Sequence, residues 1–352
     1  MAAEPSTKAK AWAIFDRIVA DSAPKGEHSN PWIKEGDGRL VYEPDYETLK
    51  RLLGVPLHLK ASTTTGVPAL ALDVWLSYEF RRAGFQADAV WPRASAPRVL
   101  PGPVVSLLEK VTVKEREALW RRLRAKTPPA GAAASSASIL GKNYLKQVDV
   151  VMSSWVAGPE LLISTKRMDS SFGKNAANRV EESYGDAKNL RLRHPLAALG
   201  FVYGLRSTIF DESPDKADWL IDLLQKLGRE DDAYHAVSLV VIEYGSHLAV
   251  DDATDDKGDG EDPLVEAGVI ESDAADEDTE EHVEPFEIEL AIATLPTVEL
   301  LWERVPADLR PDVFIAEMVR RVIEATPVNL HKNARARRAS AQQRTFSPNG
   351  GL

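Results

Sequence analysis

The sequence predicts an α/β fold, because segments with apolar residues at helical spacing alternate with short β-rich runs along most of its 352 residues. Two observations carry this prediction. A Gly-Pro turn at residues 158–159 separates two β-rich runs, and two later apolar runs each follow a helical segment. We therefore expect a central mixed sheet flanked by helices, with added helical N- and C-terminal parts.

The first part of the chain is predicted to be mainly helical. Helices are expected from about Ser6 to Asp21, from Tyr46 to Leu53 and from Pro68 to Ala83, where Gly84 suits the C-terminal end. The run QADAVWPR that follows favours a strand ended by its proline.

The middle of the chain contains the hairpin. Residues 103–127 indicate one or two helices, with a basic face, and residues 127–138 are expected to form a low-complexity linker or mobile loop. Two β-rich runs, about Val148–Trp155 and Glu160–Lys166, then flank the Gly-Pro turn. This pattern is typical of a β-hairpin.

The remaining elements complete the α/β order. Helices are expected over about Lys174–Leu190 and near 214–228, and they are followed by the apolar runs LAALGFVYGLR and AVSLVVIEYG. Two further helices are expected within residues 296–326. This order fits a sheet with helices on both faces.

Composition excludes several classes of protein. The chain has no cysteine, which excludes a disulfide framework, a Cys-ligated zinc and a thiol nucleophile. No apolar run reaches the roughly 18 residues of a membrane span, and the N-terminus has no apolar signal-peptide core. We therefore expect a cytoplasmic protein with no membrane partner.

The net charge of −11 is unevenly distributed. Between Asp251 and Glu284 there are sixteen acids and the single cation Lys257, a local balance of −15, so the rest of the chain carries +4. Nucleic acids bind basic partners. The mildly basic remainder of the chain is therefore compatible with DNA.

The hairpin carries groups that suit phosphodiester hydrolysis. That reaction needs a metal ion to generate hydroxide and to neutralise charge, and Mg²⁺ prefers carboxylate ligands. Asp149 lies in the first arm of the predicted hairpin and Lys166 at the end of the second. Antiparallel pairing would bring the two arms side by side, with the register left open.

The pattern VDVV…ELLISTK resembles the PD-(D/E)xK motif of restriction endonucleases and other DNA nucleases, and the resemblance covers roughly residues 65–245. Two positions depart from the motif. Val148 replaces the proline, and Ser164 occupies the position of the second acid, two residues before Lys166. Residues two apart share one face of a strand, so this serine lies where a metal ligand is expected.

One subgroup of type II restriction endonucleases, which cut around CCGG cores, keeps Ser-x-Lys and takes the second acid from the following helix. The resemblance implies that Asp149 and Glu181 bind Mg²⁺ and that Lys166 orients the nucleophile. Glu182 remains an alternative, because an offset of one residue turns a helical side chain by about 100°. The resemblance also implies that Glu79 supports the site electrostatically.

A polar cluster lies where the second hairpin strand leads into the next helix. Hydroxyl, amide and cationic groups at a helix N-terminus suit phosphate contacts. We expect DNA contacts from Ser170, Ser171, Lys174, Asn175, Asn178 and Arg179. For the two serines, N-capping of the helix is an equally good interpretation.

Five regions are expected. Residues 1–64 form an N-terminal helical region, 65–248 the restriction-endonuclease-like core, 249–286 an acidic disordered insertion, 287–330 C-terminal helices packing on the core, and 331–352 a basic disordered tail. The acidic insertion is interpreted as a solvating segment, with DNA mimicry as the alternative. The tail either adds phosphate contacts or is a frayed terminus.

The resemblance implies a Mg²⁺-dependent endodeoxyribonuclease of type II restriction-like character, which acts on double-stranded DNA in phage defence. It further implies a homodimer that cuts both strands and a cognate DNA methyltransferase. Two alternatives remain open. Ser164 favours a DNA-binding module with a degenerate nuclease fold if it leaves the metal site incomplete. A repair or recombination nuclease would act without a short recognition sequence.

Overall fold

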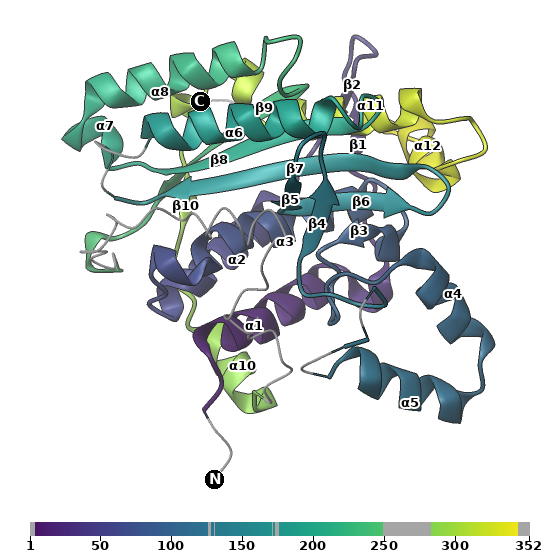
Figure 1. Ribbon diagram of the computed structural model, residues 1–352. Coiled ribbons are helices and arrows are strands. Elements are labelled where there is room, and N and C mark those ends of the chain that lie inside the picture. The colour runs from purple at the N-terminus through teal and green to yellow at the C-terminus, as the bar shows by residue number, and fades with distance from the viewer. Residues whose placement is uncertain are drawn as a thin grey trace.

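A mixed six-stranded sheet with helices on both faces forms the centre of the computed structural model, which describes residues 4–125, 128–129, 131–170, 172, 176–248 and 283–343 (Figure 1). Three central strands run parallel, and each remaining strand is antiparallel to its neighbour. In order across the sheet the strands are β10 (Glu299–Leu300), β9 (Ala236–Glu243), β8 (Ala198–Arg206), β7 (Gly158–Met168), β6 (Val150–Ser154) and β3 (Val90–Trp91).

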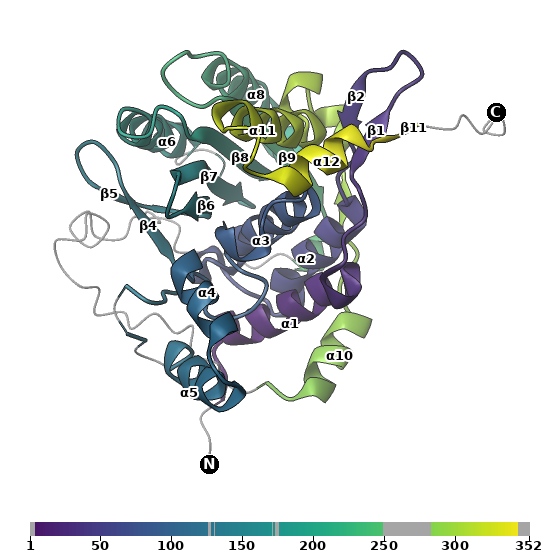
Figure 2. The same ribbon diagram turned by 90° about the vertical axis from the view of Figure 1, so that its right-hand side faces the viewer.

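Each face of the sheet packs against its own group of helices. One core contains the apolar sides of α1 (Thr7–Ser22), α2 (Tyr46–His58), α3 (Val67–Arg82) and α11 (Pro311–Ala325). The other face is covered by α6 (Ala176–Arg191) and α8 (Pro214–Leu227). Nearly all of α3 is buried, because neighbouring helices and the sheet enclose it (Figure 2). The α/β class and its two helical layers are confirmed.

The predicted hairpin is present as β6 and β7. Gly158 adopts a left-handed backbone with φ 71° at the turn, a conformation that glycine accepts without strain. The last residues to pair are Val150 and Ile163, after which β7 continues beside β8 alone. Asp149 therefore lies just before the first arm, rather than within it, at the point where the two arms separate.

Residues between β3 and β6 form two projections from the sheet. The predicted helical region contains two helices, α4 (Gly102–Lys110) and α5 (Val113–Leu123). The expected linker over 127–138 differs in part, because its end begins β4 (Ala137–Leu140), which pairs with β5 (Leu145–Val148). We call β4 and β5 the ribbon.

Helix positions elsewhere agree with the sequence to varying degrees. The first, third and later predicted helices correspond to α1, α3, α6 and α8, whereas α2 extends beyond Leu53 to His58. The stretch 296–326 contains a single α-helix, α11, together with β10 and two short 3-10 turns. Prolines at 296, 306 and 311 interrupt what was expected to be a helical pair. Helix α10 (Pro285–Ala293) precedes this stretch, and the short α7 (Ile209–Glu212) follows β8.

None of the helices in the described part of the chain is both long and apolar enough to cross a membrane.

The basic tail differs from the disorder expected of it. Residues Lys332–Ala339 form α12, and Gln342–Gln343 form β11, which joins β1 (Trp32–Lys34) and β2 (Leu40–Tyr42) in a small sheet. The Arg337 guanidinium donates hydrogen bonds to the carbonyls of His28, Ser29 and Arg82, each at 3.0 Å. The cations thus satisfy backbone carbonyls inside the fold. Residues 344–352, and 249–282 of the acidic insertion, lie outside the described residues.

We expect Gly84→Ala to lower the free energy of unfolding by about 2–4 kcal/mol. Gly84 has φ 102°, and an added Cβ would lie 2.9 Å from the Ala334 backbone and the Arg337 side chain. The substitution therefore strains the backbone and displaces α12. Urea unfolding measures the change.

The matched control is Gly185→Ala in α6, where an added Cβ meets nothing within 4 Å. There alanine is expected to stabilise the helix by up to about 1 kcal/mol. Equal stabilities for the two variants would contradict the docking of α12 against Gly84.

Candidate active site

The end of the hairpin brings Asp149 against the backbone of β7. The amide of Thr165 donates a hydrogen bond to Asp149 Oδ2 at 2.7 Å. This contact is available because β6 and β7 stop pairing at Val150 and Ile163, which leaves the next amides of β7 without a β6 partner. The sequence-predicted Asp149 is therefore fixed by a specific bond one residue away from the predicted Lys166.

A second carboxylate, which the sequence analysis missed, reaches the same threonine from α3. The Thr165 hydroxyl donates to Asp73 Oδ1 at 2.5 Å. Helix α3 is further tied to β7 by Arg167, whose Nη1 donates to the carbonyl of Pro68 at 3.2 Å. Thr165 thus links two carboxylates from different elements, one through its backbone and one through its side chain.

Electrostatics make this pair unfavourable when both acids are ionised. Burial raises the pKa of Asp73 well above its ordinary value, and the nearby charge of Asp149 raises it further. Burial also raises the pKa of Asp149, while Lys166 and the Thr165 amide oppose that rise. Asp73 is 7% exposed, whereas Asp149 is half-buried. A cation would therefore reach the pair from the side of Asp149.

Lys166 and Ser164 share one face of β7, as the sequence predicts. Their partners in β8 are Tyr203 and Phe201, which belong to the core on the α6 and α8 side. Thr165 points the other way, towards α3. The Lys166 ammonium nevertheless acts on both carboxyls, because its positive charge lowers the pKa of Asp73 and of Asp149.

A pocket of about 150 Å³ contains both carboxylates. Asp73 and Asp149 contribute to its wall together with Trp12, Trp91 and residues of the segment that leads into the ribbon. Its remaining polar side chains are those of Lys8, Ser135, Ser136 and Gln147. The volume corresponds to about five water molecules, since each occupies about 30 Å³ in the liquid.

Two carboxylates, Asp73 and Asp149, are the side chains of this pocket that could hold a divalent cation. Among the residues that the structure describes, no group of three or more His, Asp or Glu side chains could hold a metal ion. Mg²⁺ commonly uses one or two carboxylates and completes its shell with water and substrate phosphate. Asp73 and Asp149 supply those two carboxylates. A divalent cation would also relieve the repulsion that raises the pKa of Asp73.

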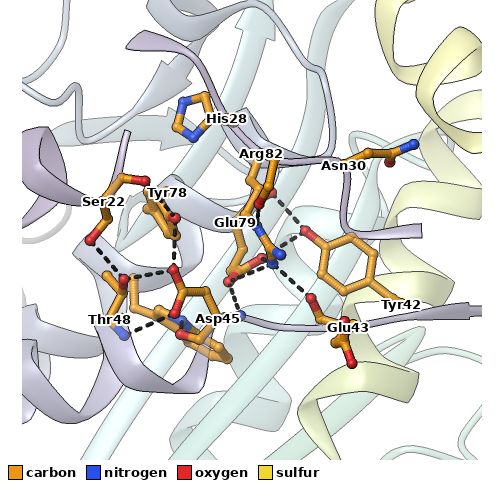
Figure 3. A network of polar contacts seen from close by, with 12 residues as sticks. Ser22, His28, Asn30, Tyr42, Glu43, Asp45, Thr48, Tyr78, Glu79 and Arg82 are labelled. Atoms are coloured by element: carbon orange, nitrogen blue, oxygen red, sulfur yellow. Dashed lines mark hydrogen bonds and ion pairs between the residues drawn. The ribbon is translucent and has the colours of Figure 1, made fainter. Parts of the chain in front are cut away.

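Glu79, which the sequence analysis placed in support of the site, lies in a separate polar network (Figure 3). Its carboxylate accepts hydrogen bonds from Tyr42 Oη at 2.8 Å and from the Asp45 amide at 2.7 Å. It also pairs with Arg82 at 3.1 Å. These contacts join α3 to α2 and β2. Of the two acids on α3, it is therefore Asp73 that the structure places beside Asp149.

On α6, Glu181 and Glu182 are both exposed, and buried neighbours such as Ser183 face the sheet. A different carboxylate of this helix turns towards Asp149. Asp186 accepts a hydrogen bond from Tyr144 at 3.0 Å and pairs with Lys146 of the ribbon at 3.0 Å. Its charge contributes to the raised pKa of Asp149, after burial. The choice between Glu181 and Glu182 remains a prediction.

The predicted DNA contacts fall at the end of β7. Ser170 is half-buried two residues past the strand. Ser171, Lys174 and Asn175 lie outside the described residues. Asn178 and Arg179 belong to α6, with their side chains also outside the description.

No protein-family model matches the sequence, and neither a curated protein nor a solved structure shows significant similarity to the chain.

One signal in the sequence could have identified Asp73. It is the lone charge in the run VPALALDVWLSY, which is otherwise apolar or uncharged. A carboxylate enclosed in such a helix is buried with it, and buried charges are rare unless a partner or a function retains them.

We expect Asp73→Asn to stabilise the metal-free protein at pH 8 by about 1 kcal/mol or more, because it removes a buried charge that lies beside the like charge of Asp149. Folded Asp73 holds its proton to a higher pH than unfolded Asp73, whose ordinary pKa is 3.8. Wild-type stability therefore falls as the pH rises from that value through the raised pKa. Asparagine keeps an acceptor for Thr165 and has no such loss.

Urea unfolding in EDTA at pH 4, 6 and 8 tests this. The advantage of Asp73→Asn should grow with pH. If Asp73→Asn is less stable than wild type at pH 8, the ionised Asp73 carboxylate does not destabilise the folded protein, and the prediction is wrong.

We expect Glu79→Gln to lower the free energy of unfolding by about 3 kcal/mol, because it leaves the guanidinium of Arg82 buried without its counter-charge. Glu182→Gln on the exposed side of α6 is the matched control, and it should change stability by less than about 0.5 kcal/mol. If Glu79 instead supports catalysis, its substitution should reduce DNA cleavage with unchanged stability.

Proposed function

We propose that this protein is a Mg²⁺-dependent endodeoxyribonuclease with a restriction-endonuclease-like core. One observation carries the proposal: Thr165 of β7, the residue before Lys166 in the sequence, bonds to both Asp73 and Asp149 at the point where the two hairpin strands separate. The mixed sheet flanked by helices supports the same fold. The resemblance of VDVV…ELLISTK to the PD-(D/E)xK motif supplies the reaction class.

Asp149 and Asp73 are proposed to hold the metal, with Glu181 or Glu182 as the alternative source of the second carboxylate. A bound Mg²⁺ supplies a water of lowered pKa and neutralises charge on the phosphate. Thr165 fixes both carboxylates, so their oxygens need little reordering when the cation binds. The Lys166 ammonium orients the attacking water and stabilises the negative charge that develops on the phosphate.

The proposed substrate is double-stranded DNA, and the proposed role is sequence-specific restriction of foreign DNA in the cytoplasm. The balance of +4 outside the acidic segment favours a polyanionic partner. Cutting both strands needs two active sites, which a homodimer supplies, and protection of host DNA needs a cognate methyltransferase.

Plasmid and phage DNA digestion tests the proposal. Wild type with Mg²⁺ is expected to give discrete fragments. Lys166→Ala, Asp149→Asn and Asp73→Asn should each lower the rate by about a hundredfold or more, since each removes a group that acts at the reacting phosphate. EDTA should abolish cleavage.

Two exposed-site variants identify the second carboxylate. Glu181→Gln and Glu182→Gln should leave stability unchanged because both side chains are exposed. Full cleavage by both would leave Asp73 as the second ligand.

Smeared products with the same metal dependence would indicate a repair or nonspecific nuclease. DNA binding without cleavage under any divalent metal would contradict the proposal and favour a binding module.

A further inference from the structure

The segment between β3 and the ribbon forms a small unit of its own, which we call the arm (residues 99–134). It is closed at its base by an antiparallel bridge between Val99 and Ala134. Inside it, α4 and α5 enclose a separate apolar cluster that includes Leu100, Leu108 and Leu123. Both views place the arm on the side of the sheet opposite α8 (Figures 1 and 2).

The arm lies next to the carboxylate pocket. A groove of about 770 Å³ runs between the arm and the first residues of the ribbon, lined in part by Arg98, Leu123 and Arg124. The groove and the carboxylate pocket have five wall residues in common, so the two spaces adjoin: Trp91, Val99, Ser135, Ser136 and Ala137. A polymer bound across Asp149 would therefore reach the C-terminal end of α5, where Leu123 and Arg124 line the groove.

Helix α5 carries an exposed row of cations. Leu119 and Leu123 turn inward, whereas Lys114, Ala118 and Arg121 recur at the spacing of the opposite face, and Arg122 lies beside them. Lys114, Arg121 and Arg122 are exposed. From Lys114 to Arg124 there are five cations and two acids.

These three cations have no structural task, unlike Arg116, Arg124 and Glu115. Arg116 donates to the carbonyl of Leu108 at 2.7 Å, and Arg124 stacks on Trp120 at 4.9 Å. Glu115 is engaged in the capping box with Thr112. Within the described part of the chain, no hydrogen bond or ion pair holds the side chains of Lys114, Arg121 or Arg122.

We infer that the arm binds the phosphate backbone of duplex DNA beside the cleaved bond, through Lys114, Arg121 and Arg122 of α5. This inference rests on the proposed nuclease function, because that function places DNA at Asp149. Exposed, unpaired cations in a row suit phosphates, which carry charge without sequence information. The arm thus positions the duplex and contributes affinity that does not depend on sequence.

The test measures binding of the full chain to a labelled duplex in EDTA over a range of salt concentrations. The triple variant Lys114→Ala, Arg121→Ala, Arg122→Ala should weaken binding by roughly tenfold or more and reduce the slope of log affinity against log salt by about two to three, close to one unit per lost phosphate contact.

The control removes three exposed cations from α8 and its C-terminal end, two of which pair with Asp222 and Asp308: Lys216→Ala, Lys226→Ala and Arg229→Ala. The change in net charge is the same, and binding should fall much less. Equal losses in the two triple variants, an unchanged salt slope, or no duplex binding by wild type would each overturn the inference. Arm-dependent binding without any cleavage would keep the inference and reject the nuclease.

Crosslinking gives an independent readout of position. Because the chain has no cysteine, Ala118→Cys and Lys216→Cys each create a single attachment site for a photoactivatable group. Duplex DNA should crosslink from α5 and not from α8. Equal yields from the two positions would contradict the placement of DNA along the arm.

Discussion

The hydrogen bonds of Thr165 to two carboxylates hold two like charges close together, and the rest of the fold must keep them there. Asp73 and Asp149 repel each other, and burial increases the cost of keeping both ionised. Such a pair persists only if the surrounding structure holds its members in place. Here α3 is enclosed on nearly all sides and is tied to β7 a second time through Arg167. The hydrophobic burial of one helix thus stabilises an arrangement that is unfavourable by itself.

The network around Glu79 serves the same helix in a different way. There the buried carboxylate has a cation, Arg82, and two hydrogen-bond donors, so its charge is compensated within the protein. The Asp73 carboxylate instead has one hydroxyl donor and a like charge beside it, and the nearby Lys166 lowers its pKa only in part. One helix therefore carries one acid whose charge is balanced within the protein and one acid whose pKa stays well above its ordinary value. On α3, Glu79 therefore has a structural role, whereas Asp73 is the candidate for a role in the site.

Local sequence was sufficient for the hairpin and for α3, because alternation, helical spacing and turn residues are properties of short segments. Local sequence did not show which of the two acids on α3 faces the sheet. Asp73 and Glu79 are six residues apart, which turns them by about 240° on a helix, and only packing decides which one meets the sheet. The contact of Asp73 with Thr165 joins residues 92 apart in the sequence. The helix α12 was missed for a related reason: its Arg337 donates to carbonyls of distant segments, which composition does not reveal.

The bridge between Val99 and Ala134 means that the chain enters and leaves the arm at nearly the same place. Strands β3 and β6 pair directly with each other, although the arm and the ribbon come between them in the sequence. Lengthening or shortening the arm would change mainly the entropy of closing a loop, which grows only slowly with length. The sheet and its carboxylates can therefore tolerate extensive variation in the arm. For the proposed nuclease, the length and sequence of the arm could therefore change while the sheet still holds Asp73 and Asp149 in place.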